Sequence, residues 1–76
     1  MNEKTITLYT YEYYNHSLEM YCASDFNWTT AEQLCNRLAN KNVGLFRITS
    51  KEFSIEEIKN RPNMPFISDY VREAIK

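Results

Sequence analysis

The stretch Thr-Ile-Thr-Leu-Tyr-Thr-Tyr-Glu-Tyr-Tyr at residues 5–14 decides the fold. It is rich in β-branched and aromatic residues and contains neither glycine nor proline, a composition typical of a β-strand. Because successive strand side chains point to opposite faces, Ile6 and Leu8 share one face. The opposite face carries three tyrosines: Tyr9, Tyr11 and Tyr13.

A turn follows at residues 15–17, because Asn15 tolerates a left-handed backbone and can hydrogen-bond its own chain. Residues 18–24 alternate again between apolar and polar, so the two runs together predict a β-hairpin. A third strand is predicted at residues 43–49, where the density of apolar residues suggests a central place in the sheet. With a helix before it, we expect this strand to run parallel to the second.

The clearest helix signal covers residues 30–40. Thr29 and Glu32 have the spacing of a capping box, in which the hydroxyl and the carboxylate each accept from an unpaired backbone N–H. An apolar stripe at helical spacing follows: Ala31, Leu34, Cys35, Leu38 and Ala39. The residues Asn40-Lys41-Asn42 are expected to end the helix.

Two shorter helices are predicted near the C-terminus. Ser54 and Glu57 form a second capping-box pattern, and Pro62 must end the helix that it opens. Ser68-Asp69 can cap a last helix, whose apolar edge is formed by Val71 with Ala74 and Ile75. The sequence therefore predicts a single α+β domain over residues 1–76, in the order β-β-α-β-α-α, with a three-stranded sheet.

Composition limits the classes of protein. The chain has 76 residues, a net charge of −1, and 43% hydrophobic residues, which is typical of one small globular domain with a small core. No apolar run approaches the ~18 residues of a membrane helix, and residues 1–7 lack the pattern of a signal peptide. We therefore expect a cytoplasmic protein that does not bind membranes.

No catalytic or cofactor-binding set is visible in the sequence. His16, the one histidine, falls in the predicted turn, away from a partner for nucleophilic catalysis. Cys22 and Cys35 lack metal-ligand spacing and are interpreted as reduced core residues. Gly44 is the one glycine, so there is no phosphate-binding loop. We expect a protein without enzymatic activity, metal or cofactor.

The tyrosines are the unusual feature, and three interpretations are open. Tyr9, Tyr11 and Tyr13, with Tyr21 from the next strand, could form an aromatic surface for a protein partner. They could instead stack on unpaired bases, although no basic residue is interleaved. They could also be structural residues that pack across strands.

Two other apolar segments are ambiguous. Trp28 precedes the first helix and is either a lid on the core or an exposed binding residue. The stretch Met64-Pro65-Phe66-Ile67 either closes the end of the sheet or presents an anchor to a partner.

In size, single domain, Asn/Lys/Ile-rich composition and lack of catalytic residues, the chain resembles small phage or mobile-element proteins that block a larger host protein. The main hypothesis is a non-enzymatic inhibitor that covers a functional surface of a protein or nucleoprotein complex. It would use the tyrosine face, Trp28 and the acidic residues Glu52, Glu56 and Glu57. The alternatives are a regulator that binds RNA or single-stranded DNA through the sheet, and a homodimer formed through a sheet edge.

Overall fold

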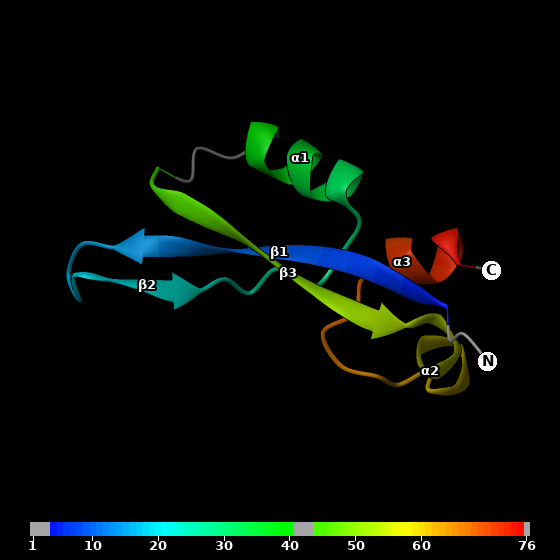
Figure 1. Cartoon of the computed structure of the whole chain (residues 1–76). Coiled ribbons are helices and arrows are strands. Elements are labelled where there is room, and N and C mark those ends of the chain that lie inside the picture. The colour runs from blue at the N-terminus through cyan, green and yellow to red at the C-terminus, as the bar shows by residue number, and fades with distance from the viewer. Residues whose placement is uncertain (1–3, 41–43, 76) are drawn as a thin grey trace.

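The computed structural model describes residues 4–40 and 44–75. The elements are β1 (Thr5–Asn15), β2 (Met20–Ala23), α1 (Ala31–Asn40), β3 (Phe46–Ser54), α2 (Ile55–Asn60) and α3 (Asp69–Ala74). The α+β class and the three-stranded sheet are thereby confirmed. The molecule is elongated, about 46 Å long and 22 Å wide, with α2 and α3 gathered at the end where β1 begins and β3 finishes (Figure 1).

The predicted strand arrangement is wrong. The sheet has the order β2-β1-β3, and both pairs are antiparallel, so β1 is central and β3 is not parallel to β2. The physical reason is the length of the strands. The four residues of β2 offer a short edge, whereas the 11 residues of β1 let all nine residues of β3 pair with it.

The predicted turn chemistry at Asn15 is confirmed, because its Oδ1 accepts hydrogen bonds from the backbone N–H groups of Ser17 and Leu18, at 2.9 and 3.1 Å. Helix α1 ends at Asn40. The rest of its predicted stop signal, Lys41-Asn42, lies outside the described residues, as does Val43, the predicted start of the third strand.

Two short segments extend the sheet beyond β2. Tyr9 and Thr29 exchange two backbone hydrogen bonds of 2.8 and 2.9 Å on the side of β1 that β2 occupies. Trp28 in turn pairs with Ile67, through hydrogen bonds of 2.8 and 2.9 Å that involve the neighbouring Phe66 and Ser68. One edge of the sheet is therefore covered by segments from both halves of the chain.

The main core lies on the Leu8 face of the sheet. Leu8, Ile58 and Val71 are fully buried there, and Ile67 is nearly so. Four further residues pack partly buried against them, besides Trp28: Ile6, Phe53, Met64 and Ile75. The core thus joins β1 to α2, α3 and the proline loop.

The two short helices begin where the sequence predicts. Ser54 Oγ accepts from the N–H of Glu57, and Ser68 Oγ accepts from the N–H of Tyr70, each at 3.2 Å. Arg72 joins α3 to α2 and to the proline loop, because its guanidinium donates to the carbonyls of Ile58 and Met64 at 3.3 and 3.2 Å.

Helix α1 departs from its prediction in two ways. The capping hydroxyl belongs to Thr30, which accepts from the N–H of Gln33 at 3.4 Å, and not to Thr29. Of the predicted apolar stripe, Leu34 is buried and Leu38 half-buried, but Cys35 is exposed. Cys22 is half-buried, so the interpretation of both cysteines as core residues is wrong. Gln33 and Arg37 of this helix are half-buried as well, so the inner face of α1 is not formed by the apolar stripe alone.

Thr29 supplies a test of the packing between β1 and α1. The residue is fully buried, and its Oγ1 has no hydrogen-bond partner within the described part of the chain. A buried polar group without a partner costs about 1–3 kcal/mol, so Thr29→Val, which keeps the branched shape, should stabilise the protein by about 1 kcal/mol. We expect the midpoint of thermal unfolding, followed by circular dichroism, to rise by about 4–8 °C. A lower midpoint would mean that the hydroxyl is satisfied in solution.

Candidate functional site

The tyrosine face of β1 is not an open aromatic surface. Tyr11 is 5% exposed, and its ring packs against Phe26 and Phe46 at centroid distances of 6.0 and 6.5 Å. Tyr9 is half-buried, and only Tyr13 is exposed. The interpretation of the three rings as one aromatic surface is therefore wrong at Tyr11, which packs as the structural interpretation expects, because the segment that carries Phe26 covers that ring.

Tyr21 lies on the opposite face from those three tyrosines. The register pairs it with Tyr14, and the two rings meet edge to face at 5.3 Å. Arg47 lies over the ring of Tyr21 at 4.5 Å and donates a 2.6 Å hydrogen bond to Glu12. The hairpin register, which the sequence alone does not reveal, decides this placement.

The remaining apolar candidates divide between core and surface. Trp28 is half-buried and packs against the core, with its ring 5.5 Å from that of Phe53, so it has the place of a core lid. Met64 and Ile67 are also core residues. Phe66 differs, because it is 71% exposed and has a φ of +67°, a backbone conformation that bulky residues rarely adopt.

The acidic candidates do not form a cluster with one role. Glu52 is exposed on β3, and Glu56 is exposed in the first turn of α2. Glu57 is already paired, because its Oε1 accepts from Arg61 at 3.1 Å. Within residues 4–40 and 44–75 there is no group of three or more metal-ligating side chains, and no helix is long and apolar enough to span a membrane.

The outer edge of β3 is the most accessible part of the sheet. The Tyr14 N–H donates a 2.9 Å hydrogen bond to the carbonyl of Leu45, its partner in the register. Because backbone groups in an antiparallel pair point alternately toward and away from the partner strand, this bond shows which residues of β3 face β1. Four residues of β3 then direct their backbone N–H and C=O groups away from β1: Phe46, Ile48, Ser50 and Glu52. In the described part of the chain no other strand pairs with this edge.

The same edge carries exposed apolar side chains. Ile48 is 54% exposed and Phe46 is 40% exposed, and Tyr13 lies opposite Phe46 in the register. The sequence prediction missed this surface, because apolar residues in this stretch suggested a central strand. Arg47 and Lys51 alternate with Ile48 and Ser50 here, and such charges are typical of an edge strand.

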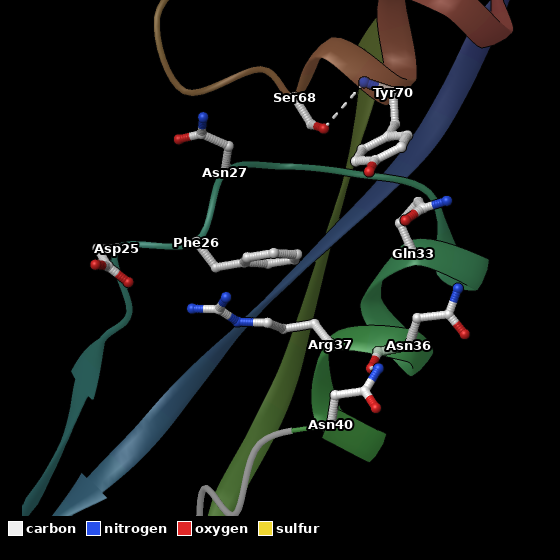
Figure 2. A pocket seen from close by; sticks show the side chains of 9 residues that line it. All are labelled: Asp25, Phe26, Asn27, Gln33, Asn36, Arg37, Asn40, Ser68 and Tyr70. Carbon is white, nitrogen blue, oxygen red and sulfur yellow. Dashed lines mark hydrogen bonds between the residues drawn. The ribbon is translucent and has the colours of Figure 1, made fainter.

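A second surface feature is a cleft of about 520 Å³ between α1, the segment that follows β2, and the start of α3 (Figure 2). At its base the Arg37 guanidinium lies 5.2 Å from the centre of the Phe26 ring. The ring of Tyr70 forms part of the opposite wall. The other lining side chains are polar: Asp25, Asn27, Gln33, Asn36, Asn40 and Ser68.

Comparison with protein-family models, with curated proteins and with solved structures gives no match. The geometry of the described residues gives two candidate sites, the outer edge of β3 and the cleft at Arg37.

Proposed function

We propose that this protein is a non-enzymatic binding module that inhibits a larger protein by adding one of that protein's segments to the edge of β3. The observation that carries the proposal is the unpaired outer edge of β3 with Phe46 and Ile48 exposed on it. An extended segment that joins such an edge gains main-chain hydrogen bonds for affinity and side-chain contacts for specificity. A few well-packed, fully desolvated anchor residues supply most of the binding energy of a protein interface.

Charge on β3 indicates the chemistry of the partner strand. Phe46 and Ile48 point to one face of the sheet, whereas Arg47 and Lys51 point to the other. A strand that alternates apolar with acidic residues would match both faces at once. Glu52 lies on the apolar side at the far end, where a basic residue of the partner would complement it.

A second copy of the chain matches this edge less well. In an antiparallel pair of β3 strands, Arg47 and Lys51 of one copy would lie on the same face as the same two residues of the other. Glu12 of β1 already pairs with Arg47 on that face, but no described residue of β3 on that face supplies an acid to offset the charge of Lys51. We therefore favour a different protein over the homodimer. The proposal places the protein in the cytoplasm, where Cys22 and Cys35, both free here, would stay reduced.

Ile48→Lys tests the proposal, because it puts a charge at the centre of the apolar edge. Wild-type protein should retain a nuclease-resistant protein partner from a lysate of the cells that make it, and the purified partner should bind with a measurable Kd. We expect Ile48→Lys to weaken that binding at least about tenfold, as the loss of a central apolar contact does. Isothermal titration calorimetry gives the comparison.

Leu18→Lys is the matched control, because Leu18 is equally exposed but lies in the hairpin turn, away from β3. It should bind as the wild type does. Equal losses in both variants, or loss of the protein partner after nuclease treatment, would contradict the proposal. So would a protein that runs as a dimer and retains no partner.

A further inference from the structure

The cleft at Arg37 is separate from the edge of β3, because it opens beside Phe26 and Tyr70 on the side of β1 that β2 occupies. Its volume of about 520 Å³ is within the range of small-molecule sites. Four carboxamide side chains line it, together with the rings of Phe26 and Tyr70.

Arg37 differs from the other arginines of the chain. Arg47 and Arg61 form ion pairs, and Arg72 donates to two carbonyls. Arg37 has no hydrogen bond or ion pair in the described part of the chain, and its buried Nε has no partner. Contact with the Phe26 ring, at 5.2 Å, holds the guanidinium at the base of the cleft. The four N–H donors of its terminal nitrogens therefore have no acceptor among the described residues.

The walls combine flat surfaces with hydrogen-bonding groups of both kinds. Phe26 and Tyr70 present rings from different segments, and Tyr70 is 60% exposed (Figure 2). Gln33, Asn36 and Asn40 follow one another along the face of α1 that borders the cleft. The carboxamides of Gln33 and Asn36 each offer two donors and an acceptor, whereas Asn40 already donates through Nδ2 to the Asn36 carbonyl at 2.8 Å. Asp25 adds a carboxylate that forms no ion pair with Arg37.

We propose that this cleft binds an unpaired purine base. Unpaired bases are recognised by stacking on aromatic rings and guanidinium planes, together with hydrogen bonds to their edges. Arginine pairs with N7 and O6 of guanine, and Asn or Gln pairs with N6 and N7 of adenine, so the cleft holds the groups that read purine edges. The base is either part of a free nucleotide or part of a single strand.

The charges of the cleft favour a base over a simple anion. A carboxylate or phosphate site gains from clustered cations, whereas the cleft holds Asp25 as well as Arg37, and among residues 4–40 and 44–75 no lysine lines it. A neutral planar group with both donors and acceptors uses Arg37, Asp25 and the carboxamides together. This inference does not rest on the function proposed for β3.

Titration of ¹⁵N-labelled protein with adenosine and guanosine 5′-monophosphates, followed by NMR, tests the inference. We expect saturable shifts of the Phe26, Gln33, Arg37 and Tyr70 signals. Ribose 5-phosphate, which lacks the base, should not produce them. A short single-stranded oligodeoxyadenylate distinguishes the source of the base. If the protein binds it at least tenfold more tightly than the mononucleotide, with an affinity that falls as salt rises, the ligand is a strand. If the two affinities are equal, the ligand is a free nucleotide.

Two variants locate the ligand. Tyr70→Ala removes an exposed ring, and Arg37→Gln removes the guanidinium but keeps a good helix former. Each should weaken mononucleotide binding about tenfold, because stacking and bidentate contacts have effects of this size. Tyr13→Ala, which removes an exposed ring that is not among the cleft-lining residues, should bind as the wild type does. Circular dichroism confirms that each variant is folded.

Three results would overturn the inference: no saturable shift with either mononucleotide, equal shifts with ribose 5-phosphate, or binding that both cleft variants retain. The second would show an anion site, and the third a ligand bound elsewhere. None of these results depends on whether β3 binds a protein.

Discussion

Leu8→Ala is expected to lower the free energy of unfolding by about 2–5 kcal/mol, the range for a leucine truncated in a packed core. Leu8 is fully buried and lies where β1, α2, α3 and the proline loop meet. The loss is large for this chain, because a domain of this size buries a small fraction of its surface and is only marginally stable. We expect the thermal midpoint to fall by about 10 °C or more.

Leu18→Ala is the matched comparison for that experiment. The chemical change is identical, but Leu18 is 61% exposed in the hairpin turn, so its effect on the free energy of unfolding should stay within about 0.5 kcal/mol. Urea unfolding of both variants measures the difference. Similar losses in the two variants would mean that the Leu8 cluster is not the principal core.

Ser50→Pro is expected to abolish binding of the partner at β3 while the protein stays folded. The Ser50 N–H points away from β1, so proline there removes no hydrogen bond of the existing sheet. It does remove a donor that an added strand requires, and its ring obstructs the approach of that strand. We expect at least a hundredfold loss of affinity, measured by calorimetry, since the central main-chain contact and its neighbours are lost together.

Lys51→Pro is the control that checks the register. The neighbouring N–H of Lys51 points toward β1 opposite Leu8, so proline at this position breaks the ladder in the middle of the sheet. This variant should be unfolded or strongly destabilised by circular dichroism. If Ser50→Pro unfolds the protein and Lys51→Pro does not, the alternation assigned to β3 is reversed. If Ser50→Pro is folded and binds normally, the partner does not add a strand to this edge.

Local signals in the sequence predicted the elements well, because they depend on neighbours in the chain. The β-branched and aromatic run of β1, the side chain of Asn15 and the caps Ser54 and Ser68 act over two to four residues, and the structure confirms them. At the start of α1 the predicted cap, Thr29, was one residue too early. Thr30, which directly precedes the helix, supplies the hydroxyl, whereas Thr29 lies in a backbone bridge with Tyr9.

The candidate sites could not be predicted in the same way. Side-chain alternation correctly placed Tyr9, Tyr11 and Tyr13 on one face, but the burial of Tyr11 depends on Phe26, which follows β2. Tyr21 lies on the opposite face from the predicted one, because a shift of one residue in the hairpin register moves every side chain of the strand to the other face. The cleft joins α1 to residues of α3 that are more than thirty positions away, as between Gln33 and Tyr70, and no local pattern reports such a contact.

The sequence by itself therefore determined that this chain forms a small α+β domain, that residues 5–14 form a strand, and where the two C-terminal helices begin. Only the tertiary structure decided which strand is central, which edge stays open and which rings meet solvent. The physical reason is that propensity, capping and turn chemistry act between near neighbours. Strand pairing and burial depend on which distant segments can pair with β1 or pack against it along its whole length. One side of β1 pairs with β3 because β3 is the longest strand available to it.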